Sequence, residues 1–146
     1  METKPIAPDA KKILVVDDNE VVLHAMSFLL KAKGYQVLLA ETGAETLGIL
    51  RKDKPDLILL DLDFPPDAGN IGGAMRDGFL LLDWARRMCA AEKIPVIIVS
   101  GLDPEQYKAR AQAAGIPTFF RKPVDNQQLL AAIHKALGDA PEKPAA

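Results

Sequence analysis

The stretch that decides the fold reads ILVVDDN and occupies residues 13–19. Its first four residues are apolar and consecutive, and most of them are β-branched. A continuous apolar run, without alternation of apolar and polar residues, is typical of a strand that is covered on both faces of its sheet. The run then breaks at Asp17 and Asp18. This stretch therefore predicts a buried strand that carries two carboxylates at its carboxyl end.

Four further apolar runs follow along the chain, and segments with helical spacing of apolar residues separate them. The expected strands are 13–16, 35–39, 56–60, 95–99 and 118–120, and the expected helices are 21–32, 44–50, 79–89, 107–114 and 129–137. Strands that alternate with helices in this way form parallel sheets with right-handed crossovers. The pattern therefore predicts an α/β fold with a doubly wound, five-stranded parallel sheet and helices on both faces.

Length and composition narrow the class of protein. The chain has 146 residues, which fits one domain, and its formal net charge of -2 argues against a direct nucleic-acid partner. Cys89 is the single cysteine, which excludes an intrachain disulfide framework. No apolar run approaches the roughly 20 residues of a membrane span, and the first residues lack the apolar region of a signal peptide. We expect a stand-alone cytoplasmic domain over residues 11–138, without membrane insertion, and flexible tails over 1–10 and 139–146.

Polar residues follow or end four of the five expected strands. Asp17 and Asp18 follow the first strand, Asp61 the third, Ser100 the fourth and Lys122 the fifth. In an open α/β sheet, ligands bind outside the carboxyl ends of the strands. Clustered carboxylates repel one another and need a cation, and their hard oxygens suit Mg²⁺. A metal, a lysine and a hydroxyl around one carboxylate indicate phosphoryl transfer, in which carboxylates are known acceptors.

Four segments together resemble the receiver domain of two-component response regulators. They read ILVVDDN at 13–19, LILLDLDFP at 57–65, VIIVSG at 96–101 and FFRKP at 119–123. The resemblance covers residues 11–138 and implies a flavodoxin-like sheet with the strand order 2-1-3-4-5. It also implies a phosphoryl-accepting signalling switch like the stand-alone chemotaxis regulators. Such a protein is not an enzyme in the ordinary sense, although it promotes its own phosphorylation and dephosphorylation.

The resemblance assigns the acidic residues to the acceptor and to the metal. It implies that Asp61 accepts the phosphoryl group. Asp18 and Asp61 would bind Mg²⁺ through their side chains, and Asp17 would act largely through water. Asp63 would contribute its backbone carbonyl to the same ion.

The remaining site residues are assigned to the phosphoryl group and to the switch. Lys122 would bind a phosphoryl oxygen, and its peptide bond to Pro123 would be cis. Ser100 would move toward the phosphoryl oxygen on activation, and Phe119 holds the aromatic switch position three residues before the lysine. The implied phosphodonor is a sensor histidine kinase or a histidine phosphotransfer protein, and a downstream protein would read the result.

The chain departs from the family pattern in two places. The Asp77-Gly78 pair comes much later after Pro65 than is usual, which indicates an insertion of roughly nine residues within the segment 66–76. That loop is either a lid or partner-specific contact that changes access to Asp61, or a tolerated surface insertion. The acidic side chain of Asp63 is the second departure, and we expect it to alter the lifetime of the phosphoryl group.

Two other functions remain open on the sequence. The Asp61-Leu62-Asp63 segment also resembles the nucleophile motif of haloacid-dehalogenase phosphatases, with Asp63 as the acid/base, but that assignment leaves Asp17 and Asp18 unexplained. A receiver-shaped scaffold that signals without phosphate is the other alternative, and the complete set of acidic residues together with Lys122 argues against it.

Overall fold

A computed structural model describes residues 10–62, 78–88 and 94–138 of the chain. In these residues strands and helices alternate, and one short 3₁₀ helix, η2, precedes the fourth α-helix. The elements are β1 (Lys12–Val16), α1 (Glu20–Ala32), β2 (Gln36–Ala40), α2 (Gly43–Asp53), β3 (Leu57–Leu60), α3 (Gly78–Met88), β4 (Val96–Ser100), η2 (Pro104–Gln106), α4 (Lys108–Ala113), β5 (Phe119–Arg121) and α5 (Asn126–Leu137).

The strands form one parallel sheet in the order β2-β1-β3-β4-β5. This order confirms the fold that the sequence and the resemblance predicted. At the end of β1, Val16 pairs with Ala40 of β2 on one side and with Leu60 of β3 on the other. Because the strands are parallel, their carboxyl ends lie along one edge of the sheet. We call it the carboxyl edge, and Val16, Ala40, Leu60, Ser100 and Arg121 end the strands there.

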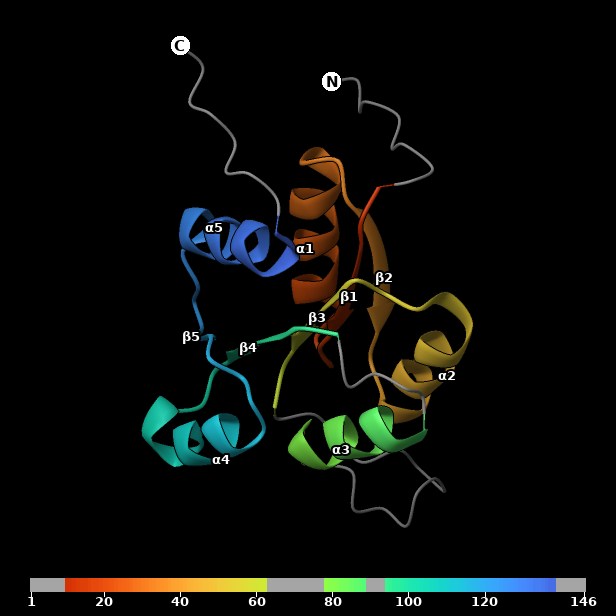
Figure 1. The fold of residues 1–146 in the computed structure, drawn as a ribbon. Coiled ribbons are helices and arrows are strands. Elements are labelled where there is room, and N and C mark those ends of the chain that lie inside the picture. Colours follow the sequence, from red (N-terminus) through yellow and green to blue (C-terminus); the bar gives the residue numbers. More distant parts are fainter. Residues whose placement is uncertain (1–9, 63–77, 89–93, 139–146) are drawn as a thin grey trace.

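Helices cover both faces of the sheet, with α2, α3 and α4 on one face and α1 and α5 on the other (Figure 1). Successive residues of a strand point to opposite faces. Leu14 and Val16 of β1 therefore join the core under α2 and α3, whereas Ile13 and Val15 join the core under α1 and α5. Both cores are apolar, which explains why the strand runs show no alternation.

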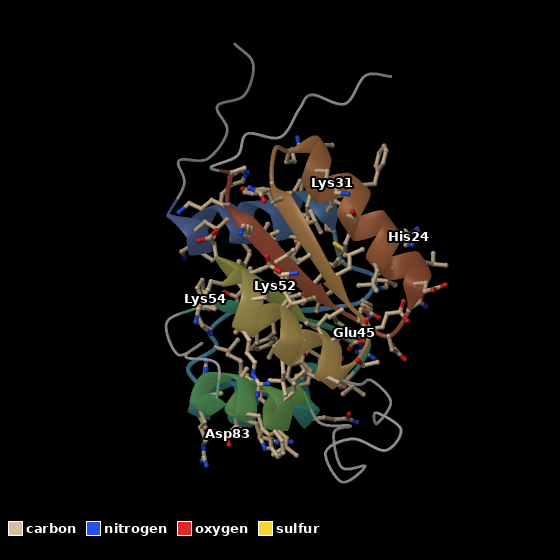
Figure 2. All side chains as sticks on the ribbon, turned by 90° about the vertical axis from the view of Figure 1, so that its right-hand side faces the viewer. His24, Lys31, Glu45, Lys52, Lys54 and Asp83 are labelled. Atoms are coloured by element: carbon tan, nitrogen blue, oxygen red, sulfur yellow. The ribbon has the colours of Figure 1, made fainter. Side chains whose placement is uncertain are left out.

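Polar side chains lie on the outer faces of α1, α2 and α3. Figure 2 shows His24 and Lys31 on α1, Glu45 and Lys52 on α2, and Asp83 on α3, and all five side chains are exposed. Among the residues that the structure describes, no helix has both the length and the apolar character needed to cross a membrane.

Several expectations lie outside the described residues. These are the flexible tails, the loop 66–76, Asp63 and Cys89. The expected strands lie close to the observed ones: β2, β3, β4 and β5 each begin one residue later than expected, and β1 begins one residue earlier. The observed helix is shorter than the predicted 107–114, because α4 spans only Lys108–Ala113. The 3₁₀ helix η2 precedes it and was not predicted.

Candidate functional site

Asp17 and Asp18 leave the end of β1 at the carboxyl edge. The backbone N–H of Asp17 donates to the carbonyl of Ala40 at 3.1 Å, which fixes the chain beside the end of β2. The Asp17 side chain is buried, and its Oδ1 accepts a hydrogen bond from the backbone N–H of Asn19 at 2.9 Å. Asn19 in turn caps α1, because its side chain accepts from Val21 and Val22. The turn between β1 and α1 thus directs the Asp17 carboxylate inward, whereas Asp18 is exposed.

Asp61 follows β3, the strand next to β1. Its backbone N–H donates to the carbonyl of Val16 at 2.9 Å, so that the chain after β3 runs alongside the end of β1. Only 6% of the Asp61 surface is exposed. This register brings Asp61 beside Asp17 although the two residues are far apart in the sequence.

Lys122 reaches the same place from β5, across β4. Its backbone N–H donates to the carbonyl of Ser100 at 2.8 Å, and the Lys122-Pro123 peptide bond is cis, as predicted. Its Nζ lies 2.5 Å from Oδ2 of Asp17 and 3.3 Å from Oδ2 of Asp61. The ammonium therefore bridges the two buried carboxylates.

The electrostatics of Lys122 result from two opposing effects. Burial alone lowers the pKa of its ammonium, because it removes water from the charged form. The hydrogen bond to Asp17 and the charges of Asp61 and Asp17 outweigh burial, so that the pKa of Lys122 lies above its ordinary value. Lys122 is thus held in its charged form against the carboxylates.

The three carboxylates form one cluster, which we call the acid site. Asp17, Asp18 and Asp61 each offer an oxygen, and these oxygens lie within 4.8 Å of one another. With Lys122 in contact, the formal charges of three carboxylates and one ammonium leave two negative charges. Such a set of oxygen donors suits a hard divalent cation.

Ser100 and Phe119 lie close to the acid site in the sheet. Ser100 ends β4 and is fully buried, and its Oγ accepts a hydrogen bond from the N–H of Leu102 at 3.2 Å. Phe119 begins β5 and is half-buried. Its ring packs edge-on against Tyr107, with 5.5 Å between the ring centroids. The predicted switch residues thus sit on neighbouring strands, and Ser100 pairs with Arg121.

Two residues near the site were not singled out by the sequence argument. Gly78 opens α3 next to the acceptor strand, and an added Cβ would lie 2.9 Å from Cα of Leu62 and 3.2 Å from the carbonyl oxygen of Asp61. The Asp77-Gly78 pair is the signal in the sequence, but by itself it indicates only the length of the preceding loop. Tyr107 is the second, and the sequence offered only its place in a weak helix.

The acid site is distinct from a second hollow that the described residues line. That hollow holds about 600 Å³ and lies at the amino ends of β4 and β5, where Pro95 and Thr118 border it. The acid site instead opens at the carboxyl edge, as ligand sites of doubly wound sheets do.

Comparison with known proteins gives a consistent result. The family model described as the response regulator receiver domain matches residues 13–134. The protein PilH of Pseudomonas aeruginosa is 32% identical over 126 residues, which cover 86% of this chain and 97% of PilH. The polar-differentiation response regulator DivK of Brucella anthropi is 28% identical over 130 residues, which cover 89% of this chain and 98% of DivK.

Solved structures agree with the sequence comparison. A CheY-like receiver domain protein from Methanospirillum hungatei superposes with a TM-score of 0.76 at 28% identity and covers 89% of this chain and 95% of its own. The chemotaxis protein CheY4 of Vibrio cholerae gives a TM-score of 0.75 at 25% identity, covering 88% of this chain and 99% of its own. Because the family match spans most of the chain and includes every residue of the acid site, this chain belongs to the response regulator receiver domain family and is a phosphoryl-accepting switch of two-component signalling.

Proposed function

We propose that Asp61 accepts the phosphoryl group from a phosphohistidine of a sensor histidine kinase or a histidine phosphotransfer protein. The observation that carries this proposal is the ammonium of Lys122, which lies within contact distance of both Asp17 and Asp61 at the carboxyl edge. The proposed receiver domain spans residues 11–138. The phosphatase alternative gives no role to Asp17 and Asp18, whereas a receiver uses both.

Mg²⁺ fits the acid site by the chemistry of its donors. Asp17, Asp18 and Asp61 offer carboxylate oxygens in one cluster with excess negative charge, and Asp18 is exposed to solvent. We propose that these residues hold the ion, with Asp17 acting largely through water and with the backbone carbonyl of Asp63 as a further ligand. Mg²⁺ supplies neutralisation of the charge that builds up on the transferring phosphoryl group.

The transfer exchanges one bond for another. A carboxylate oxygen of Asp61 attacks phosphorus, the P–O bond forms, and the P–N bond to the donor imidazole breaks. Lys122 donates to a phosphoryl oxygen and stabilises its negative charge. Ser100 exchanges its bond with the N–H of Leu102 for one to the phosphoryl group. In a separate step, water attacks the phosphorus, the P–O bond to Asp61 breaks, and inorganic phosphate leaves with the free carboxylate restored. The protein thus promotes both its phosphorylation and its dephosphorylation.

Two proposals concern residues outside the described part of the chain. The acidic side chain of Asp63 is proposed to alter the lifetime of the phosphoryl group, and the Asp63→Asn variant is expected to change its decay rate. The segment 66–76 acts as a lid or partner contact, and its deletion is expected to change the rates of phosphotransfer and dephosphorylation. Unchanged rates would reduce the segment to a tolerated insertion.

We assign the kinase or phosphotransfer partner to the outer face of α1. Val21 and Phe28 are 77% and 75% exposed and lie two helical turns apart on the same face. An exposed apolar stripe on a helix is a suitable contact for a partner protein. α1 begins directly after the acid site, so a partner on this stripe can deliver its phosphohistidine to Asp61.

We place this exchange in the cytoplasm, where histidine kinases draw on ATP. We expect a downstream protein, rather than nucleic acid, to bind the phosphorylated form.

Incubation with Mg²⁺ and a small-molecule phosphodonor, followed by intact mass spectrometry, tests the proposed function. Wild type is expected to gain one phosphoryl group with Mg²⁺ and none with a chelator. Asp61→Asn should gain none, whereas Asp83→Asn, which removes an exposed carboxylate from α3, should behave as wild type. Turnover of a phosphate ester without bound phosphate would favour the phosphatase, and a folded wild type that gains no mass would favour the scaffold.

A further inference from the structure

Tyr107 lies between η2 and α4, on the side of β5 that faces α4. Its side chain is 4% exposed. Within the described residues, its hydroxyl is a buried polar atom without a hydrogen-bond partner. Buried hydroxyls nearly always find a partner, so this one needs an explanation.

The ring of Tyr107 contacts the switch position directly. It packs edge-on against Phe119, with 5.5 Å between centroids and 77° between ring planes. Phe119 starts the three-residue strand that ends beside Lys122. Lys122 follows this strand directly, and its backbone N–H donates to the carbonyl of Ser100. Phe119 is therefore linked through the backbone to Lys122 and Ser100, the two residues that are proposed to bind the phosphoryl group. A change in the packing of Tyr107 therefore acts on the part of the sheet that reaches the acid site.

The elements around Tyr107 are short. η2 has 3 residues, α4 has 6, and no side chain caps the start of α4. Helices of this length have little stability of their own and depend on packing. The conformation of η2 and α4 therefore depends strongly on the tertiary contacts of Tyr107.

The Tyr107 hydroxyl is costly in this conformation because it has lost water without gaining a partner among the residues that the structure describes. Burial raises the pKa of Tyr107, with the charge of Arg121 opposing the rise and that of Asp103 adding to it. The group is therefore a neutral hydroxyl near pH 7, and its cost is that of an unmade hydrogen bond rather than of a buried charge.

We propose that Tyr107 is a positioning residue whose unpaired hydroxyl destabilises the unphosphorylated conformation of the α4–β5 face. A second conformation, in which the hydroxyl reaches water or a polar group, is thereby brought closer in free energy. Phosphorylation of Asp61 selects that conformation, so the hydroxyl makes phosphorylation easier. This inference rests on the proposed function of Asp61.

The test compares the same substitution at two buried tyrosines. Tyr107→Phe removes the unpaired hydroxyl, and we expect the melting temperature without phosphodonor to rise by about 3–6 °C. Tyr35→Phe is the matched control, because Tyr35 is 5% exposed and its hydroxyl lies 3.1 Å from Nδ1 of His134. This control loses a made hydrogen bond, so its melting temperature should fall.

The second readout is the initial rate of phosphorylation by a small-molecule phosphodonor with Mg²⁺. We expect Tyr107→Phe to slow it about fivefold, because the competent conformation becomes rarer, and Tyr35→Phe to leave it unchanged. A Tyr107→Phe protein that melts at or below the wild-type temperature overturns the inference, as does one that is stabilised but phosphorylated at the wild-type rate. In either case wild type still accepts phosphate, whereas failure of the proposed function shows as a wild type that accepts none.

Discussion

Lys122 illustrates how one residue sets the electrostatics of the acid site. Its ammonium contacts two carboxylates that the fold has largely withdrawn from water. Removing one partner from such a group leaves the others uncompensated, which costs more than the loss of an exposed ion pair. Lys122 therefore stabilises the unphosphorylated protein and is also in place to meet a phosphoryl oxygen.

The raised pKa of Lys122 predicts how its contribution depends on pH. A lysine whose pKa is higher in the folded than in the unfolded protein contributes fully below the unfolded value of about 10.4, and the contribution is lost as the pH rises through the folded value. We expect Lys122→Met to lower the free energy of unfolding by about 1–3 kcal/mol at neutral pH. Between about pH 7 and 9 that loss should be constant, and above about pH 10 it should shrink.

Urea unfolding of wild type and variant across this pH range, without Mg²⁺, measures the effect. Lys108→Met is the control, because Lys108 forms an exposed ion pair with Glu105 at 3.0 Å. Lys108→Met is expected to change the free energy of unfolding by no more than about 0.5 kcal/mol. If the loss of unfolding free energy in Lys122→Met disappeared between pH 7 and 9, Lys122 would not be held in its charged form as its raised pKa implies.

Gly78 predicts a second effect at the scale of one residue. An alanine there would place a Cβ 2.9 Å from Cα of Leu62, so the backbone next to Asp61 must shift. We expect Gly78→Ala to cost about 1–3 kcal/mol of unfolding free energy, as overpacking does, and to slow phosphorylation of Asp61.

Gly48→Ala is the matched control for Gly78→Ala. Gly48 lies in α2 with nothing within 4 Å of an added Cβ, so its replacement should stabilise the protein by about 0.5–1 kcal/mol. Its phosphorylation rate should equal that of wild type. If both variants were phosphorylated at the same rate, the close approach of Gly78 to Asp61 would have no effect on phosphorylation.

The secondary-structure elements show what apolar patterning can and cannot locate. Continuous apolar runs predicted five strands, and the structure confirms all five. The ends were less well predicted, because the ladder continues into polar residues: Ser100 pairs with Arg121 at the end of β4 and β5. Backbone pairing, rather than hydrophobicity, sets these ends, so the polar residues that matter for function sit at the places that a hydropathy pattern leaves undefined.

Helix caps provide a prediction that separates stability from function. Asp125 caps α5 by accepting from Gln127 and Gln128, and Asn19 caps α1 in the same way. Replacing either by alanine should cost about 0.5–2 kcal/mol of unfolding free energy. The backbone N–H of Asn19 also donates to the carboxylate of Asp17. Alanine keeps that N–H but removes the side-chain cap that fixes the turn carrying it, so only Asn19→Ala is expected to change the phosphorylation rate.

Chemical denaturation and phosphorylation rates of the two cap variants check this prediction. Equal losses of stability combined with a slower rate in Asn19→Ala alone agree with the proposed site. Equal slowing in both variants would mean that the rate follows global stability and that the β1–α1 turn has no special role.

At the scale of the whole molecule, topology explains why the acid site could be anticipated. Lys122 is separated by 105 residues from Asp17 and by 61 from Asp61, yet their side chains meet. Parallel strands place their carboxyl ends along one edge, so polar residues that end separate strands converge there. The convergence of Asp17, Asp18, Asp61 and Lys122 was therefore predictable without a structure, and the structure confirms it.

Other features could not be predicted from the sequence, because they depend on side-chain orientation and on non-repetitive backbone. The hydrogen bond from the N–H of Leu102 to Oγ of Ser100 depends on the turn after β4. The unpaired hydroxyl of Tyr107 depends on how α4 packs on β5. Neither contact produces a periodic pattern in the sequence, so neither could be predicted from it. Both lie in the part of the molecule that is proposed to change conformation on phosphorylation.

The most direct test of the central claim is to identify the residue that carries the phosphoryl group. Borohydride reduces the acyl phosphate of an aspartate to homoserine, which peptide mass spectrometry locates after phosphorylation in the presence of Mg²⁺. We predict homoserine at position 61 and unmodified aspartate at positions 17 and 18. Homoserine at another position, or a stable phosphate on Ser100 or on a histidine, would contradict the account.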